Sequence, residues 1–314
     1  MISAISVPLC YRSRSFEEGG SLLIHYVLLA VMAVSATVFA FFFLRDVWKK
    51  RSAYRATPAG PLLGASFVVS FFVTFGIGGF ATMTSFYKLT KLVEDRVIPG
   101  TLNVGLCLPV AIQTFIFITV VKVDPLTLVS MILAATIGAV LGAGVVSKLP
   151  ADKVRIGLGS ALIVVALTIL AGLLKLTPSG GEALGLAGAK LVLAIAVNFV
   201  LGALMTIGIG LYAPCMALIF ALGMHPLAAY PIMMGSCTLL QSWAGIRFIK
   251  ASAYHAKAAF AFAAAGIVAV PLAAYIVKSL PVTALKWIVI VVILYTSTVM
   301  FRSIGKDKVP EPGH

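Results

Sequence analysis

Acidic side chains are scarce in this chain of 314 residues, which has 10 Asp and Glu against 24 Lys and Arg. Charged residues of both signs together make up only 11% of it. The acidic residues all fall outside the long apolar segments, in stretches typical of loops or tails: Glu17, Glu18, Asp46, Glu94, Asp95, Asp124, Asp152, Glu182, Asp307 and Glu311. The pattern excludes a proton relay through an Asp or Glu buried among apolar helices.

Residues that carry metal and nucleophile chemistry are also few. The four cysteines, Cys10, Cys107, Cys215 and Cys237, form no C-x-x-C pair, and the four histidines form no cluster. The chain lacks an H-E-x-x-H motif and paired aspartates within its apolar segments. We therefore expect no disulfide, no metal site and no cofactor, and a protein that is not an enzyme.

Hydrophobic residues, by contrast, make up 61% of the chain, and its mean hydropathy of +1.09 is typical of an integral membrane protein. A helix needs about 20 apolar residues to cross the hydrocarbon core of a bilayer. Segments of this kind lie at 22–44, 98–121, 125–147, 154–175, 226–248, 257–278 and 283–301. The predicted fold class is an all-α polytopic membrane protein, with membrane lipid as its surroundings.

The formal net charge of +14 comes from Lys and Arg residues in the loops between apolar segments. Loop Lys and Arg in membrane proteins mark the cytoplasmic side, so we interpret them as topology signals and expect no nucleic-acid partner. The densest cluster follows segment 22–44 and consists of Arg45, Lys49, Lys50, Arg51 and Arg55. It predicts an N-terminus outside the cell and, after the remaining crossings, a cytoplasmic C-terminus.

A pattern of glycines and prolines occurs twice in the same order. Its first copy is Gly76-Ile77-Gly78, Pro99-Gly100-Thr101 and Leu149-Pro150, and its second is Gly208-Ile209-Gly210, Pro231 with Gly235-Ser236, and Leu280-Pro281. Internal repeats in an apolar chain are typical of transporters. The sequence therefore predicts two homologous repeats, at 55–176 and 186–304. They follow an N-terminal tail (1–21) and one extra transmembrane helix (22–44), and precede a C-terminal tail (305–314).

Two further apolar segments, 61–87 and 189–222, contain the glycine motifs. The second would be about 51 Å long as a single helix, which exceeds the bilayer. Gly and Pro destabilise helices, so a break is expected in each segment. Each is either a kinked crossing or a re-entrant pair of half-helices. The re-entrant arrangement puts more Lys and Arg on the cytoplasmic side, and it favours two inverted repeats.

The chain resembles the TauE/SafE sulfite exporter family, a group of bacterial permeases built from two related halves, over residues 55 to 304. The motifs that carry the resemblance are Gly76-Ile77-Gly78-Gly79, Pro99-Gly100-Thr101, the small-residue run Gly138, Gly142 and Gly144, Leu149-Pro150 with Arg155, and then Gly208, Gly210, Pro214, Gly235-Ser236 and Leu280-Pro281 with Lys286. The resemblance implies a permease of the bacterial inner membrane. Its substrate would be a small sulfur-containing anion such as sulfite or an organosulfonate, moved by alternating access between the repeats.

Two departures from the family pattern bear on the substrate. Phe80 and Thr82 stand where the first glycine element has a third glycine and then a proline, and Leu211 and Tyr212 stand at later glycine positions of the second element. Bulkier side chains there are expected to reshape the cavity. The alternatives are an anion channel or a permease for a different small organic anion. Transport direction, coupling ion and oligomeric state stay open.

A helix broken in lipid leaves backbone N–H groups without partners, and a half-helix N-terminus suits an anion. The predicted substrate site combines Gly76, Gly78, Gly79, Gly208 and Gly210 with the side chains of Thr101, Asn103, Gln113, Ser236 and Gln241. Secondary candidates are Thr82, Thr84, Ser85 and Tyr212. The alternative is that the polar groups join helices and the glycines allow close packing, as we expect for Gly138, Gly142 and Gly144.

Overall fold

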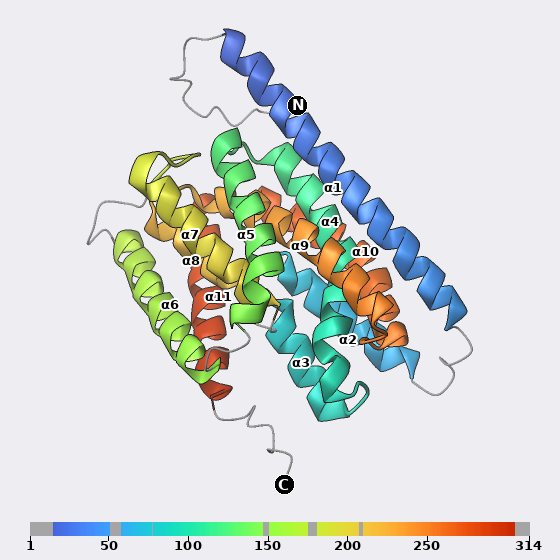
Figure 1. The fold of residues 1–314 in the computed structure, drawn as a ribbon. Coiled ribbons are helices and arrows are strands. Elements are labelled where there is room, and N and C mark those ends of the chain that lie inside the picture. Colours follow the sequence, from blue (N-terminus) through green and yellow to red (C-terminus); the bar gives the residue numbers. More distant parts are fainter. Residues whose placement is uncertain are drawn as a thin grey trace.

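The computed structural model describes residues 15–50, 58–76, 78–146, 151–174, 181–206 and 210–304, and every regular element in them is a helix (Figure 1). The α-helices are α1 (Ser15–Lys49), α2 (Ala59–Val73), α3 (Gly79–Thr90), α4 (Ile98–Val120), α5 (Pro125–Val146), α6 (Ala151–Leu173), α7 (Gly188–Met205), α8 (Tyr212–Ala221), α9 (Ala229–Lys250), α10 (Ala256–Ser279) and α11 (Val282–Arg302). Two 3₁₀ turns, η2 (Asp95–Val97) and η3 (Pro226–Ala228), precede α4 and α9. Most of the two predicted tails lies outside the described residues.

Four helices in the described part of the chain are long and apolar enough to cross a membrane: Leu23–Lys49 of α1, α4, α7 and Ala256–Val277 of α10. Three of them coincide with predicted spans, and α7 lies in one of the two segments predicted to be broken. The other predicted spans are helical too, as α5, α6, α9 and α11. The chain is an all-α protein whose apolar helices suit a membrane.

The predicted break in segment 61–87 is confirmed. Helix α2 ends at Val73 and α3 begins at Gly79, and between them Gly76 has φ +94°, a left-handed conformation that favours glycine. In segment 189–222, α7 ends at Met205 and α8 begins at Tyr212. Gly208 falls in this second interruption, outside the described residues.

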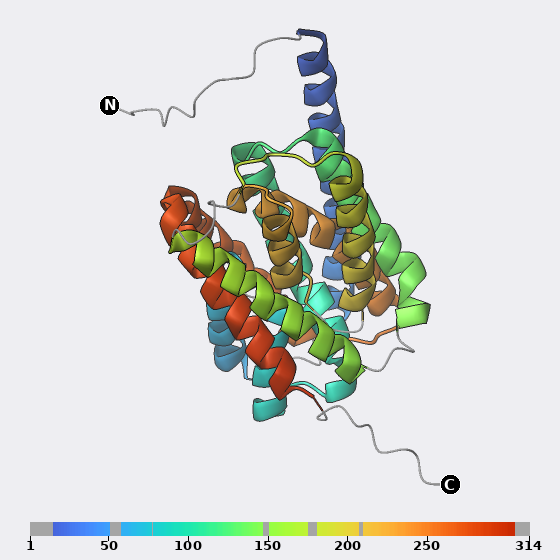
Figure 2. The ribbon, with the colours of Figure 1, turned by 90° about the vertical axis from the view of Figure 1, so that its left-hand side faces the viewer.

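The order of elements from α2 to α6 recurs from α7 to α11: a helix, an interruption, a short helix, a 3₁₀ turn and three long helices. Helices α4 and α9 start 131 residues apart, as do α5 and α10, and α6 and α11. The packing crosses between the two sets, since α2 lies against α10, α7 against α5, and α4 against α9. Helices α6 and α11 also run side by side (Figures 1 and 2).

Equivalent loops of the two sets lie at opposite ends of the bundle. We call the end with loops 91–97 and 251–255 the lower end; there the backbone N–H of His255 donates to Thr101 Oγ1 at 2.9 Å. The upper end holds loops 121–124 and 222–228. Both bind one short segment there, because Asp124 N–H donates to the carbonyl of Leu184, and His225 N–H to that of Ala183, each at 2.8 Å.

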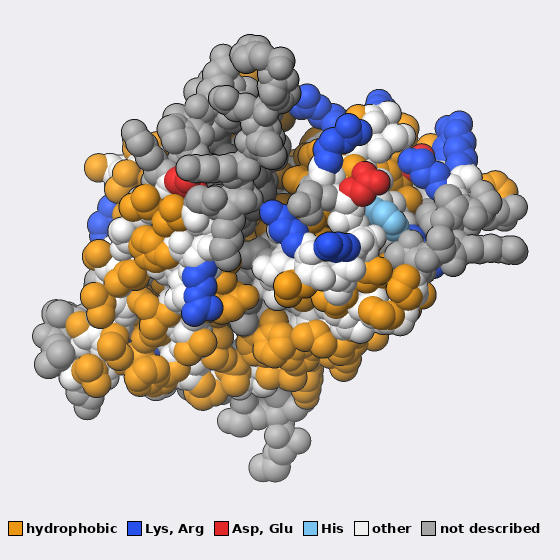
Figure 3. Space-filling view, turned by 90° about the horizontal axis from the view of Figure 1, so that it is seen from below, with side chains coloured by type: hydrophobic (Ala, Val, Ile, Leu, Met, Phe, Trp, Pro, Cys, Tyr) orange, Lys and Arg blue, Asp and Glu red, His pale blue; other side chains and the backbone are white. Residues whose placement is uncertain are grey.

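The long helix α1 packs on the outside of the bundle against α9 and α4 and extends beyond the upper end (Figure 1). Its Met32 and Phe39 are buried, and they contact α9 at Gly235 and Gly245. Figure 3 looks onto the lower end and shows Lys and Arg side chains on it, above flanks covered with apolar side chains. Lys50, from the cluster that the sequence analysis assigned to the cytoplasmic side, lies at this end, where its Nζ donates to Ser252 Oγ at 3.5 Å.

The predicted packing role of Gly138 is confirmed. A Cβ at Gly138 would press on the carbonyl oxygen of Phe199 in α7, and one at Gly202 on that of Ala135 in α5. The two helices thus approach through a reciprocal pair of glycines, as small residues allow in membranes. For Gly142 and Gly144, which lie in α5, the surroundings are outside the described part.

Replacing Gly138 by Ala should destabilise the protein, since the methyl group meets backbone that has no space to retreat. We expect a loss of about 1–3 kcal/mol, as for other overpacked sites. Gly64→Ala in α2 is the control, because a Cβ there meets no atom within 4 Å. Thermal unfolding of the purified proteins in detergent measures both. Equal midpoints for the two variants would contradict the packing role.

Candidate functional site

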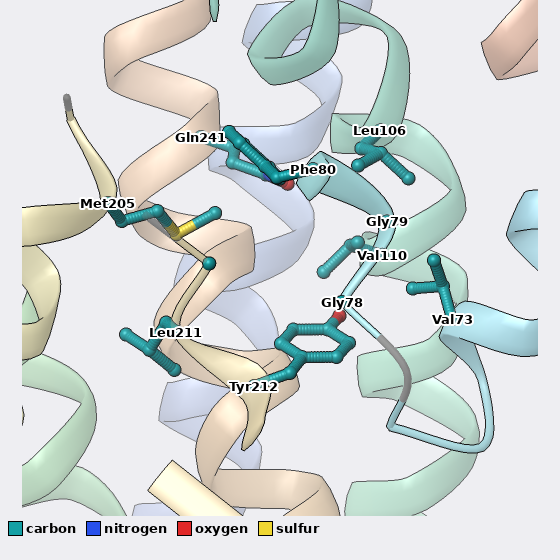
Figure 4. A pocket seen from close by; sticks show the side chains of 11 residues that line it. Val73, Gly78, Gly79, Phe80, Leu106, Val110, Met205, Leu211, Tyr212 and Gln241 are labelled. Atoms are coloured by element: carbon teal, nitrogen blue, oxygen red, sulfur yellow. The ribbon is translucent and has the colours of Figure 1, made fainter. Parts of the chain in front are cut away.

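A small cavity lies where the two interruptions face each other (Figure 4). The first set of helices contributes Val73, Gly78, Gly79, Phe80, Leu106 and Val110. The second contributes Met205, Gly210, Leu211, Tyr212 and Gln241. The predicted meeting of the two breaks is thus present, and four of the predicted site residues line the cavity: Gly78, Gly79, Gly210 and Gln241.

The lining is built from equivalent positions of the two sets. Ten of the eleven lining residues form pairs 131 or 132 positions apart: Val73 with Met205, Gly78 with Gly210, Gly79 with Leu211, Phe80 with Tyr212, and Val110 with Gln241. The two sets therefore enclose the cavity with the same parts of their structure.

Two helix N-termini open onto the cavity. Helix α3 begins at Gly79 and α8 at Tyr212, and neither has a side-chain cap or an acidic residue in its first turn. The first N–H groups of a helix have no partner within it, and they carry a partial positive charge of about half a unit. All lining residues are uncharged. The electrostatic character of the cavity therefore comes from backbone donors, an arrangement that suits an anion.

The glycines at the breaks differ in their surroundings. A Cβ at Gly78 or Gly210 would meet nothing within 4 Å, so both positions border open space. A Cβ at Gly79 would lie 2.6 Å from Val73 Cγ2, and one at Gly76 would meet the end of Met216. Gly78 and Gly210 thus leave the backbone accessible from the cavity. Gly76 serves the turn, and Gly79 also serves packing.

Gln241 is the polar side chain whose position most directly indicates a ligand. It extends from α9 into the lining and is only 1% exposed to solvent. Its amide oxygen is buried and has no hydrogen-bond partner. Buried polar atoms normally have partners, and an exception calls for a functional explanation.

Gln113 lies behind the cavity wall and joins the two interruptions. Its Nε2 donates to Thr74 Oγ1 at 2.8 Å, and its Oε1 accepts from the hydroxyl of Tyr212 at 3.0 Å. Thr74 in turn donates to the carbonyl of Ser70 at the end of α2. Gln113 was predicted to contact substrate; the structure instead engages both ends of its amide in a bridge from the end of α2 to the start of α8.

Removing the Tyr212 hydroxyl should weaken this bridge. Tyr212→Phe keeps the ring but leaves the buried oxygen of Gln113 without a donor, which costs about 1–3 kcal/mol. Tyr295→Phe is a matched control, because the Tyr295 hydroxyl also makes a hydrogen bond, with Thr82 at 3.2 Å, but the side chain is 40% exposed. Thermal unfolding should show a larger loss for Tyr212→Phe. A loss no larger than that of the control would contradict the bridge.

Three predicted site residues lie away from the cavity. Thr101 donates to the carbonyl of Val97 and accepts from the backbone of His255, so it fastens α4 to the loop before α10. Asn103 Nδ2 donates to the carbonyl of Pro99 at 2.9 Å, one turn earlier in α4. For Thr101 the structure favours the alternative of the sequence analysis, in which polar groups hold helices, whereas Asn103 bonds only within its own helix.

Ser236 is the third of them. Its hydroxyl accepts from Asn198 Nδ2 at 3.2 Å, and the same Nδ2 donates to the carbonyl of Met131 at 2.7 Å. This buried group joins α7, α9 and α5. Sequence reasoning gave Tyr212 only a secondary place, and it missed the apolar lining at Val73, Leu106, Val110 and Met205. The register with Gln241 and with the breaks could have identified Val110 and Met205.

The loop that Thr101 binds at the lower end contains His255, whose protonation makes the stability of the protein depend on pH. His255 caps α10, because its Nδ1 accepts from the backbone N–H of Ala258 at 3.2 Å. Burial lowers the pKa of His255 below its ordinary value of 6.5, an effect that nearby Glu94 opposes and Lys257 reinforces. The folded state thus favours the neutral ring, which alone can accept this hydrogen bond.

Acid should therefore weaken the protein through this group. Above the unfolded pKa of 6.5 both states are neutral, and stability falls as the pH drops through that value, since the unfolded chain binds the proton more readily. Thermal unfolding between pH 5 and 8 measures the slope. In His255→Asn, which keeps a capping oxygen but does not titrate, the slope should be smaller. An unchanged slope would contradict the assignment of this pH dependence to His255. The pH dependence would then come from His225, whose pKa is also lowered by burial.

Comparison with known proteins gives no match: no protein-family model, no curated protein and no solved structure corresponds to this chain.

Proposed function

We propose that this chain is a membrane permease for a small sulfur-containing anion, such as sulfite or an organosulfonate, like the TauE/SafE exporters that it resembles. The observation that carries the proposal is the uncapped N-termini of α3 and α8, which open onto one cavity without a charged side chain in its lining. Backbone donors from two directions can replace part of the hydration shell of an anion.

We propose further that α2 to α6 and α7 to α11 are inverted repeats. Two inverted copies place equivalent loops at opposite membrane faces, whereas parallel copies place them at the same face. The loop before α4 lies at the lower end, and its counterpart before α9 lies at the upper end. Conversely, the loop after α4 lies at the upper end and the loop after α9 at the lower end. This exchange supports the inverted arrangement.

Each interrupted segment then forms a re-entrant hairpin. In the second, Lys190 in the first turn of α7 donates to the carbonyl of Leu222 at the end of α8, at 3.2 Å, so both ends of the hairpin lie at the upper end. In the first, α3 leads back to the lower-end loop 91–97. Its turn reaches far up, because the carbonyl of Phe75 accepts from the hydroxyl of Tyr230, near the start of α9. The hairpins thus enter from opposite ends and meet at the cavity.

In the alternating-access cycle that we propose, the bundle as described is closed towards the upper end. The rings of Phe117 and Tyr230 stack there with centroids 4.8 Å apart, and Tyr230 also binds the first turn. The Gln113 bridge between the two hairpins adds to this closure. The lower end, which carries the Lys and Arg of Figure 3, is the cytoplasmic side in this proposal.

An anion channel is the second candidate, because the acidic residues of the described segments lie at the ends of the bundle and supply no intramembrane carboxylate for coupling. Flux in proteoliposomes separates the two. A permease saturates as the concentration of sulfite or sulfonate rises, whereas a channel gives flux proportional to concentration. Absence of any flux of these anions would contradict both.

The glycines that border open space provide the test of the site. Gly78→Ala and Gly210→Ala each add a methyl group to the cavity without a clash, so both variants should fold. The methyl group obstructs approach to the backbone N–H groups, and we expect transport and anion-dependent thermal stabilisation to fall at least about tenfold in apparent affinity, or about 1.4 kcal/mol. Gly60→Ala in α2, also without a neighbour within 4 Å, is the control. Parental binding by both cavity variants would place the site elsewhere.

A further inference from the structure

The cavity borders the last residues of two helices as well as the first residues of two others. Helix α2 ends at Val73 and α7 ends at Met205, both residues line the cavity, and neither helix has a basic residue in its last turn. The last carbonyl groups of a helix have no N–H partner within it, and they carry a partial negative charge of about half a unit. Hydrogen-bond acceptors therefore border the cavity beside the donors of α3 and α8.

The acceptors at the two helix ends differ in how far they are already bound. At the end of α2, the carbonyl of Val73 accepts from Gly76 N–H at 2.9 Å, and Thr74 Oγ1 accepts from Gln113 at 2.8 Å. Thr206 is the equivalent threonine at the end of α7, and its hydroxyl donates to a carbonyl of its own helix at 2.7 Å. The lone pairs of that hydroxyl oxygen stay available, so the end of α7 is the better source of oxygen ligands.

The side chain of Gln241 adds a further acceptor. Its Oε1 is buried without a hydrogen-bond partner, and the residue is only 1% exposed. In Figure 4, Gln241 lies between Met205 and Val73 on the cavity. A buried oxygen atom without a partner indicates a bound donor or a bound cation. A fully ionised oxyanion supplies neither, because its own oxygen atoms are acceptors.

The available ligands indicate which kind of cation fits. All lining residues are uncharged, and the described segments hold no group of three His, Cys, Asp or Glu side chains that could bind a metal ion. The sequence-based expectation of no metal site concerned such side chains. Neutral oxygen atoms suit hard cations, but Ca²⁺ and Mg²⁺ sites use carboxylates as well, so a monovalent cation is favoured. The cavity has room for about one water-sized particle, which fits Na⁺ better than the larger K⁺.

A bound cation also lowers the cost of holding an anion at this place. A single charge buried among apolar helices without a partner is costly. The start of α3 lies directly against the end of α2, since a Cβ at Gly79 would lie 2.6 Å from Val73 Cγ2. Donors and acceptors are therefore neighbours around the cavity, and so are an anion and a cation bound to them. Their mutual attraction is strong where water is excluded.

We propose that the cavity binds a Na⁺ ion through Gln241 Oε1 and the carbonyl oxygens at the end of α7, and that this ion and the transported anion bind together. The inference rests on the proposed anion transport and adds the coupling ion to it. Room for the anion beside Na⁺ comes from the opening of the cavity during the transport cycle. Such coupling is reciprocal, so Na⁺ and the anion raise each other's affinity by the same factor.

The first experiment measures thermal stabilisation of the purified protein by sulfite and by ethanesulfonate, with Na⁺, K⁺ or choline as the cation at constant pH and ionic strength. In Na⁺, the anion should act at a concentration at least about tenfold lower than in choline, and K⁺ should have a smaller effect. Titration with Na⁺, with and without the anion, should give the same factor.

The outcomes of this titration separate the two proposals. Equal action of the anion in Na⁺ and in choline would overturn the inference, assign the space at Gln241 to a water molecule and leave anion transport standing. An effect of K⁺ as large as that of Na⁺ would overturn the assignment to Na⁺. No stabilisation by either anion in any of the three salts would overturn both the inference and the proposed function.

The second experiment removes the oxygen ligand. Gln241→Met keeps the length of the side chain but lacks Oε1, and should lower the affinity for Na⁺ about 10- to 100-fold, the range for a lost interaction between a polar group and a charge. Thr238→Val is the matched control. Thr238 lies one turn before Gln241 on α9, is fully buried and bonds Thr114 at 2.7 Å, but it does not line the cavity.

The control variant should unfold at a lower temperature than the parent protein but keep its affinity for Na⁺. Parental Na⁺ affinity in Gln241→Met would show that Oε1 is not a ligand. A loss of Na⁺ affinity in Thr238→Val as large as in Gln241→Met would show that the effect comes from general loosening of α9. Either result would overturn the cation site.

Discussion

Backbone hydrogen bonding among apolar helices is the constraint on which this structure depends. An interrupted helix in lipid exposes N–H and C=O groups that only protein, bound water or a ligand can satisfy. Here two interruptions face each other, and the amide of Gln113 connects the end of α2 to the start of α8. The donors that stay open are those at the N-termini of α3 and α8. The cavity is the place where the fold leaves its backbone unsatisfied.

The crossed packing of the helices holds that arrangement in place. Helix α2 packs on α10 and α7 on α5, while α4 and α9 pass each other at the centre with Thr114 and Thr238 bonded between them. Close contact of α5 and α7 depends on Gly138 and Gly202, where backbone meets backbone. The correspondence of the lining positions follows from this framework, and the polar side chains of Tyr212 and Gln241 break it, since their counterparts are the apolar Phe80 and Val110.

Much of the framework could be predicted from the sequence, because Gly and Pro report backbone behaviour directly. The break near Gly76 and the offset of the two sets follow from residues that helices tolerate badly. The residues of the substrate site were harder to predict, because a polar residue in an apolar helix can bind either a ligand or a neighbouring helix. Thr101 and Ser236 turned out to fasten helices. Val110 has no polar side-chain atom, so only its correspondence with Gln241 could have placed it in the lining.

The exchange of helices between the two sets has a consequence for how the chain is made. Helix α2 finds its partner α10 only after some 180 further residues have been synthesised, and α5 must wait for α7. Meanwhile the amide of Gln113 lies in the membrane without the hydroxyl of Tyr212. Large proteins commonly fold through partly assembled intermediates, and distant pairings are reached last. The first set of helices therefore cannot complete its packing when it leaves the ribosome, and the cavity forms only when the second set packs against the first.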